Sequence, residues 1–195
     1  MPAEFSPVAE YLSEFAALSE REQLQLYERA GAHRFCKGEQ VITIHQSCRR
    51  VHFVQSGLAR HYYYDRNGNE VTTWFSETGA LVTDFAAFTT GVPATFQVEA
   101  LTELHTLSLT QEALQYLFDH HKKWERIGRL INQHYLILLI ERSSSMAVKS
   151  ARQRYEAFCE SSPHLFNEVP LKHIASFLGI TLETLSRLRA DKYAG

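Results

Sequence analysis

Residues 49–76, RRVHFVQSGLARHYYYDRNGNEVTTWFS, predict a strand followed by a β-hairpin. The first nine residues alternate between apolar and polar side chains, as a half-buried strand does. The hairpin turn at residues 65–69 is rich in residue types that tolerate positive φ. Further strands are predicted in VITIHQ (41–46) and in TFQVEALTELHTLSLT (95–110), which holds two of them. Short strands separated by turn signals at intervals of about ten residues indicate a β-barrel or sandwich.

Helical periodicity flanks these strands on both sides. Residues 6–31 carry apolar side chains at helical spacing, and Ser19 with Glu22 has the pattern of a capping box, which predicts two short helices. A longer helix is predicted from residue 122 to residue 143. The apolar stripe of this longer helix consists of Trp124, Ile127, Ile131, Tyr135 and Leu138.

The second half of the long helix, YLILLI (135–140), is apolar almost all round, so one neighbouring face cannot bury it. We expect the stripe to form a self-association seam; the alternative is a core helix buried within its own chain. The following ERSSSM (141–146) interrupts the stripe and predicts a hinge.

Residues 170–189, PLKHIASFLGITLETLSRLR, predict two helices joined by a tight turn. Gly179 suits the positive φ that ends a helix, and Thr181 suits the N-cap of the next one. Ala175, Gly179 and Leu185 match the spacing of a helix-turn-helix. The outward face of the second helix carries residues that can bind base edges and phosphates, namely Thr181, Glu183, Thr184, Ser186, Arg187 and Arg189, and Lys172 precedes them. A packed helical hairpin with a solvated face is the alternative.

Charge and composition describe an ordinary globular chain with one locally basic end. The formal net charge is −2, whereas residues 149–195 carry +2. That asymmetry has the sign that DNA binding requires. No apolar run has the length of about 18 residues that spans a membrane, and the start MPAEFSPVAEYLSEF lacks the features of a signal peptide, so we expect a cytoplasmic protein.

Neither metal binding nor catalysis is predicted. Cys36, Cys48 and Cys159 form no CxxC pair and are expected to be reduced, packed thiols. A metal enzyme with a cupin-type roll needs an HxH pair with an acid close behind it. His45 has no second histidine at that spacing, and His52 and His61 lie on other strands or faces.

The order of these parts resembles the cyclic-AMP receptor protein/FNR (Crp/Fnr) superfamily of bacterial transcription regulators. KGEQVI (37–42), residues 51–70, TDFAAFTTGVPATFQVEAL (83–101) and residues 170–189 carry the resemblance. It implies an α+β fold with an N-terminal cyclic-nucleotide-binding-type β-roll, a double-stranded β-helix or jelly roll with flanking helices. The implied parts are the roll with its N-terminal helices (1–121), a long dimerisation helix and hinge (122–145) and a helix-turn-helix DNA-binding domain (146–195). Gly38, Gly57, Gly68 and Gly91 fall where that roll makes its turns.

In this family a short cassette holds a cyclic nucleotide through a Gly-Glu pair and an Arg followed by Ser or Thr. The matching positions here are Thr83, Asp84, Ala94 and Thr95, so the arginine is missing and the acid is shorter. A buried phosphate without a cation partner loses a charge-assisted pair at a cost of several kcal/mol. We therefore expect no response to cyclic AMP and no cofactor; whether another small ligand binds stays open.

The resemblance further implies which partners the protein has. Glu183 and Arg187 match the pair that reads base edges in the family, and a two-fold dimer is expected to prefer a pseudo-palindromic double-stranded DNA site. RNA polymerase is a further candidate partner, and no membrane is expected. The chain resembles a short form, because the connection at residues 162–170 leaves little room for a wing hairpin. The alternatives are a ligand-binding or protein-interaction module that has lost DNA binding and, less in keeping with the residues, an enzyme.

Overall fold

A computed structural model describes residues 6–193 of the chain. The first five residues of the segment compared above with a signal peptide, and the last two residues of the chain, lie outside the described residues. The chain divides into two compact units: unit 1 comprises residues 1–62 and 75–133, and unit 2 comprises residues 63–74 and 134–195. This division differs from the predicted boundaries at residues 121 and 145, because the hairpin tip and the second half of the long helix pack with the C-terminal helices.

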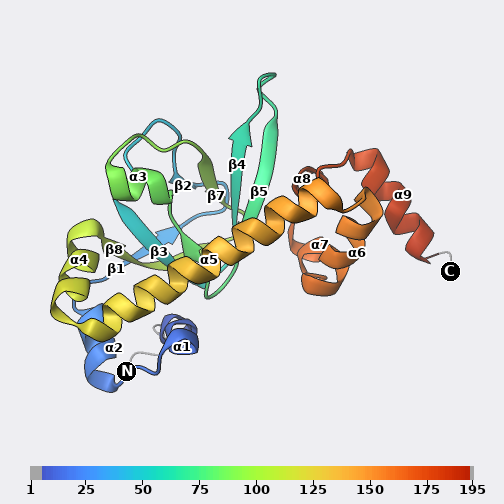
Figure 1. Ribbon diagram of the computed structural model, residues 1–195. Helices are drawn as coiled ribbons and strands as arrows, with labels where there is room; N and C mark the ends of the chain where they lie inside the picture. The colour runs from blue at the N-terminus through green and yellow to red at the C-terminus, as the bar shows by residue number, and fades with distance from the viewer. Residues whose placement is uncertain (1–5, 194–195) are drawn as a thin grey trace. The chain divides into compact units, whose positions relative to one another are not determined.

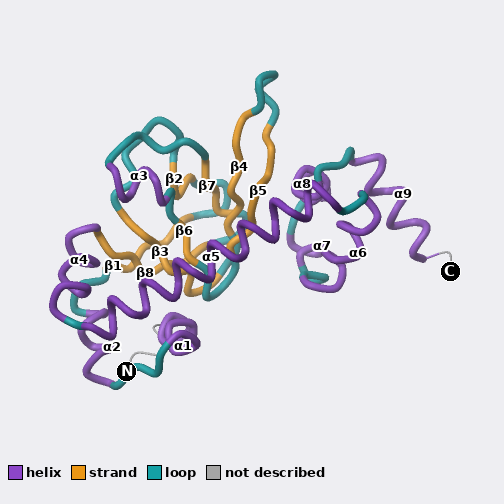
Figure 2. Tube along the Cα trace, viewed as in Figure 1, coloured by secondary structure: helices purple, strands orange, loops and turns teal. Residues whose placement is uncertain are grey.

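Unit 1 is built on a β-roll of two four-stranded sheets (Figures 1 and 2). The first sheet has the order β1-β8-β3-β6 and the second β2-β7-β4-β5. The strands are β1 Gly31–Phe35, β2 Gln40–Ile42, β3 Arg50–Ser56, β4 Ala59–Tyr64, β5 Glu70–Ser76, β6 Leu81–Val82, β7 Gln97–Ala100 and β8 Leu104–Thr110. The pairs β1–β8, β2–β7, β3–β6, β3–β8 and β4–β7 are antiparallel. Antiparallel strands can be joined by short turns.

The strand and hairpin predicted at residues 49–76 are confirmed as β3, β4 and β5. The predicted turn positions are confirmed too, since Gly38, Gly57, Gly68 and Gly91 all have φ between 77° and 97°. The strand predicted at residues 41–46 ends at Ile42, because residues 43–46 form a turn in which Gln46 N donates to Thr43 O at 3.1 Å and His45 has a φ of 66°. The two strands predicted in residues 95–110 are β7 and β8.

Helices cover the roll of unit 1. They are α1 Ser6–Phe15, α2 Glu20–Tyr27, α3 Phe85–Thr90, α4 Gln111–His120 and the first part of α5 Lys122–Val148. The predicted capping box is confirmed: the Ser19 hydroxyl accepts from Glu22 N, and the Glu22 carboxylate accepts from Ser19 N at 2.8 Å. Helix α3 was not predicted, because six residues are too few for a helical period to show.

The first half of α5 belongs to the core of unit 1. Trp124, Ile127 and Ile131 are 3%, 1% and 7% exposed. Their prediction as a self-association seam is therefore wrong: the tertiary structure covers them within their own unit, and the periodicity alone could not say which partner they face. Tyr135 and Leu138 are half-buried.

The second half of α5 leaves apolar residues exposed. Leu136, Ile137, Leu139 and Ile140 are 55–59% exposed. The hinge predicted at residues 141–146 is also wrong, since α5 is helical through Val148. Arg142 donates to Phe177 O, and Met146 packs close to Gly179, so contacts on both sides of the serines hold this segment helical.

Unit 2 is a helical unit that includes the tip of the β4–β5 hairpin. Its further helices are α6 Ala151–Ser161, α7 Leu165–Glu168, α8 Leu171–Leu178 and α9 Leu182–Tyr193. The core contains Tyr155, Phe158, Ile174, Leu178 and Leu185, each at most 6% exposed. Residues 162–170, predicted as a connection, contain the short α7, which buries Leu165.

Among the helices of residues 6–193, none combines the length and the apolar character needed to cross a bilayer.

Candidate nucleic-acid interface and ligand sites

Helices α8 and α9 are joined by the tight turn that the sequence predicted. Gly179 has φ 64° and ψ 38°, and its N–H donates to carbonyls of the last turn of α8. The Thr181 hydroxyl accepts from Thr184 N at 3.1 Å, which confirms Thr181 as the N-cap of α9. The positive φ favours glycine at position 179, and a Cβ there would lie 2.6 Å from Met146 Cε, so the methionine side chain would have to shift.

The outward face of α9 is open to solvent. Thr181, Glu183, Ser186 and Arg187 are exposed, whereas Thr184 and Arg189 are half-buried. Lys172 is exposed on α8. Leu185 and Leu188 face the opposite way and are 0% and 9% exposed, so the core residues hold the polar face outward.

Several candidate contact residues are already engaged within the unit. The Thr181 and Thr184 hydroxyls lie 3.0 Å apart, and the Ser186 hydroxyl donates to Leu182 O. Arg189 lies over the Phe166 ring at 5.4 Å. Arg187 and Glu183, one helical turn apart, extend from the face without such contacts among the described residues.

Two arginines hold the C-terminal end of α8, and the sequence did not single them out. Arg154 Nε donates to Leu178 O at 2.8 Å, and Arg142 donates to Phe177 O and lies over the Phe177 ring at 3.9 Å. Burial, together with the nearby charge of Arg154, lowers the pKa of Arg142 to about 10. A cation at a helix C-terminus satisfies carbonyls that lack partners in the helix, so these contacts orient α8.

Ser176 ties α8 to the hairpin tip within unit 2. Thr72 N donates to the Ser176 hydroxyl at 2.9 Å, and that hydroxyl donates to Glu70 O at 3.2 Å. One side chain thus satisfies two backbone groups of β5. A serine in the middle of an amphipathic helix gives no sequence signal for such a role.

The acidic residue of the cassette, Asp84, is hydrogen-bonded to other groups of the protein. Asp84 is 2% exposed and is the N-cap of α3, where it accepts from Ala87 N at 3.1 Å. Its other carboxylate oxygen accepts from Thr95 N at 2.9 Å and from the Thr95 hydroxyl at 3.1 Å. Thr83 is half-buried, and its hydroxyl donates to Arg50 O. The structure thus brings the predicted residues together, but the carboxylate is engaged with the protein itself.

The position that carries the arginine of the cassette is a buried alanine here. Ala94 is 1% exposed, and its N–H and carbonyl bond to the backbone of residues 46 and 45. The roll contains one fully buried arginine among its described residues, Arg60, whose Nε donates to Glu99 Oε1 at 2.9 Å. Its guanidinium also lies 4.0 Å from the centre of the Tyr62 ring. Arg60 is therefore neutralised by its own neighbours.

The histidines considered for a metal site have other roles. His52 Nδ1 lies 3.0 Å from the Thr106 hydroxyl, and His61 Nε2 lies 2.9 Å from the Ser76 hydroxyl. Burial lowers the pKa of each to about 4, and for His52 the neighbouring His33 and Arg50 act in the same direction. Both rings are thus neutral at pH 7. Among the described residues, no three His, Cys, Asp or Glu side chains gather as metal ligands would.

The three cysteines are free thiols, as expected, but they are not all packed. Cys48 is buried and Cys159 half-buried, whereas Cys36 is exposed, which corrects the expectation for that residue.

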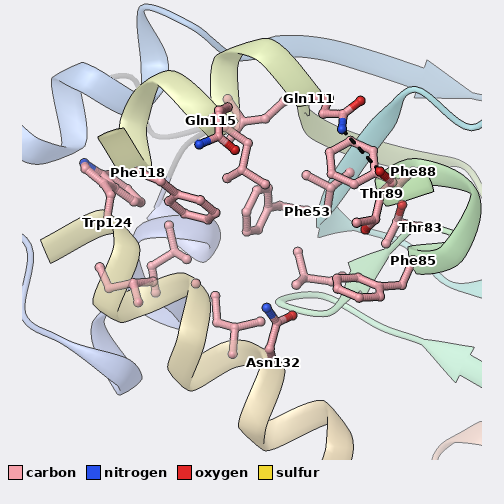
Figure 3. Close-up of a pocket in the computed structure, with 18 residues that line it drawn as sticks. Phe53, Thr83, Phe85, Phe88, Thr89, Gln111, Gln115, Phe118, Trp124 and Asn132 are labelled. Atoms are coloured by element: carbon pink, nitrogen blue, oxygen red, sulfur yellow. Dashed lines mark hydrogen bonds between the residues drawn. The ribbon is translucent and has the colours of Figure 1, made fainter. Parts of the chain in front are cut away.

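A cavity lies in unit 1, and the cassette residue Thr83 is part of its lining. It has a volume of about 250 Å³ and is bounded by β3, α3, α4 and the first half of α5 (Figure 3). Aromatic rings surround its centre, with Phe53, Phe118 and Trp124 on one side and Phe85 and Phe88 on the other. Sequence reasoning missed this cavity, because its walls come from distant segments.

Comparison with known proteins supports the fold. Residues 32–121 match the family model of the cyclic nucleotide-binding domain. The structure of FixK2 from Bradyrhizobium japonicum is similar, with 17% sequence identity, a TM-score of 0.73 and coverage of 85% of each chain. No curated protein sequence matches the chain significantly.

Two further solved structures share the fold at low identity. A variant of CooA from Carboxydothermus hydrogenoformans is 21% identical over 94% of this chain and 83% of that chain, with a TM-score of 0.70. The c-di-GMP responsive global regulator CLP of Xanthomonas campestris is 15% identical over 88% of this chain and 90% of that chain, with a TM-score of 0.66. The predicted resemblance to the Crp/Fnr superfamily is thus confirmed for the fold.

Proposed function

We propose that this chain, which has the fold of the Crp/Fnr-type regulators and whose residues 32–121 match the cyclic nucleotide-binding domain, is a DNA-binding transcription regulator. A regulator of this kind acts in the cytoplasm, and RNA polymerase is a further candidate partner. We assign the protein no catalytic activity.

The main support for this proposal is the outward face of α9. Glu183 and Arg187 are exposed on one face of a helix that a glycine turn and buried leucines hold in place. A helix presented in this way can enter the major groove, where arginine bonds guanine bidentately and glutamate accepts from the cytosine amino group. Lys172, Thr181, Thr184, Ser186 and Arg189 complete the proposed interface, contacting mainly phosphates.

Cyclic AMP is not the effector in this proposal. Its phosphate would find Ala94 in place of a cation, and its ribose would have to displace Thr95 from the Asp84 carboxylate. Burying an unpaired phosphate charge costs several kcal/mol, which removes binding at physiological concentrations. Calorimetry with cyclic AMP tests this point, and micromolar binding would contradict it.

The regulator is proposed to act as a homodimer through the second half of α5. The seam consists of the exposed Leu136, Ile137, Leu139 and Ile140, with Tyr135 and Leu138 at its edge. A continuous apolar patch of this kind is unusual on a monomer and marks an interface. A two-fold dimer presents two copies of α9, so its site is pseudo-palindromic with half-sites about one helical turn apart.

Selection from a random duplex library, followed by gel-shift titration at several salt concentrations, tests DNA binding. We expect a selected palindromic consensus, and Arg187→Ala should weaken binding to it by about 10- to 100-fold while relaxing one base position. Arg21→Ala is the matched control, since Arg21 is also exposed but lies on α2 in unit 1. If no consensus emerges, or if both variants bind alike, the protein is instead a module that has lost DNA binding.

A further inference from the structure

The cavity between β3, α3, α4 and α5 has the properties of a small-molecule site. Its volume is about 250 Å³, it opens to solvent on one side, and it is concave and mostly apolar, as small-molecule sites are. Five aromatic rings and a set of aliphatic side chains form most of its lining. A concave apolar surface of this kind favours a ligand that is itself largely apolar.

Close packing of α4 against α5 forms one wall. A Cβ at Gly128 would lie 2.5 Å from Phe118 Cζ and 2.8 Å from its Cε1. Glycine at position 128, in the first third of α5, therefore leaves room for the tip of the Phe118 ring, which lines the cavity. Trp124 borders the same wall, and its indole N–H is already occupied by Gln25 Oε1 at 3.3 Å.

The described lining of the cavity is uncharged, and this defines the class of ligand. None of the eighteen described residues that line the cavity is charged. A charged ligand would therefore lose its hydration without gaining a counter-ion, so the site selects a neutral molecule.

The polar groups lie at the rim of the cavity. Gln111 and Thr89 are joined there by a hydrogen bond from Gln111 Nε2 to Thr89 O, and Asn132 lies on α5 opposite Phe85 (Figure 3). Phe85 is 60% exposed, which places it at the opening. One polar group on the ligand can thus bond at the rim while its ring is buried.

We propose that this cavity is a binding site for a neutral, aromatic small molecule with a single hydrogen-bonding group. The site adjoins the cassette, because Thr83 lines it, but Asp84, Ala94 and Thr95 do not. It does not depend on the proposed DNA binding.

Calorimetry of the full chain with a matched pair of probes tests the class of ligand. We expect 1-naphthol to bind with a dissociation constant on the order of tens of micromolar, as its size allows. The anion 1-naphthoate, which carries the same ring system, should bind at least about 10-fold more weakly. Absence of naphthol binding, or equal binding of both probes, would overturn the proposal.

Two variants test the location. Leu114→Trp places a larger side chain in the cavity and should abolish naphthol binding. Phe85→Ala removes an exposed rim contact, which the fold tolerates, and should weaken binding several-fold. The control Val92→Ala changes another exposed apolar residue of the same segment that does not line the cavity, and should leave binding unchanged. Naphthol binding that survives both Leu114→Trp and Phe85→Ala places the molecule elsewhere and refutes the site. Because these titrations contain no DNA, their failure is separate from a failure of the regulator proposal.

Discussion

A charge placed in the exposed half of α5 should convert the protein to monomers. The test variant is Ile140→Glu, because Ile140 is 56% exposed and lies among three other apolar residues of similar exposure. A charge at Ile131, which the sequence alone would have suggested, is unsuitable because Ile131 is 7% exposed in the core of unit 1.

The magnitude follows from the exposure of the seam. Full burial of a leucine or isoleucine contributes about 1.5–3 kcal/mol, so covering the exposed half of one such side chain contributes about 0.75–1.5 kcal/mol. Four side chains on each of two protomers then supply about 6–12 kcal/mol, against an association cost of about 4–15 kcal/mol. The margin is small, so the seam is sensitive to a single change.

Ile140→Glu removes about 1.5–3 kcal/mol of burial over the two protomers and adds the cost of desolvating two carboxylates. The dimer dissociation constant should therefore rise at least about tenfold from the lost burial alone, and further from the carboxylates. Sedimentation velocity over a range of concentrations measures this change. The control is Leu24→Glu, since Leu24 is also 56% exposed but lies on α2. A wild-type chain that sediments as a monomer, or an Ile140→Glu chain with the mass of the wild type, refutes the reasoning.

Three further predictions concern stability and the cassette. His52 and His61 have folded-state pKa values of about 4 against 6.5 in the unfolded chain, so the unfolded state binds more protons and stability falls as the pH drops from about 6.5 to about 4. At pH 5 each ring should lower the free energy of unfolding by about 2 kcal/mol relative to pH 8. In denaturant unfolding, His61→Asn should therefore lose less stability than the wild type between pH 8 and pH 5. The same pH dependence in both proteins would contradict the assignment. Gly179→Ala should lower the unfolding free energy by about 1–3 kcal/mol, because a φ of 64° is strained for alanine and the Met146 side chain must also shift; an unaltered melting temperature would disprove this. Ala94→Arg should destabilise the fold, because position 94 is 1% exposed, and calorimetry should detect no binding of cyclic AMP to the variant. Tight binding would show that the missing arginine alone prevents the cassette from holding cyclic AMP.

Local patterns were sufficient for many elements of this protein. Alternation and turn residues predicted β3 and the β4–β5 hairpin, and the capping box predicted the start of α2. The turn between α8 and α9 followed from Gly179 and Thr181, because a positive φ and an N-cap are requirements of the backbone within a few residues. These features are local in the chain, so their physical causes are visible in the sequence.

Other predictions failed where packing partners decide the outcome. The apolar stripe of α5 showed correctly that the helix must be covered, but the period is the same whether the cover is its own unit or a second chain. Ser143–Ser145 looked like a hinge, yet contacts from Arg142 and Met146 to the end of α8 keep α5 helical. The intrinsic preference of three serines is smaller than these tertiary contacts.

The sequence alone determined the longer strands and helices, though not β1, β6, α3 or α7, together with the glycine turns, the polar face of α9 and the missing arginine at Ala94, since each depends on residue type and near neighbours. Only the tertiary structure decided that Trp124, Ile127 and Ile131 are core residues, that Asp84 is occupied by Thr95, that Ser176 bonds the hairpin tip and that an uncharged aromatic cavity lies beside α5. The physical reason is that burial and long-range hydrogen bonds depend on which distant segments meet. The apolar pattern of the sequence shows that a helix or strand must be covered, but it does not show which segment covers it.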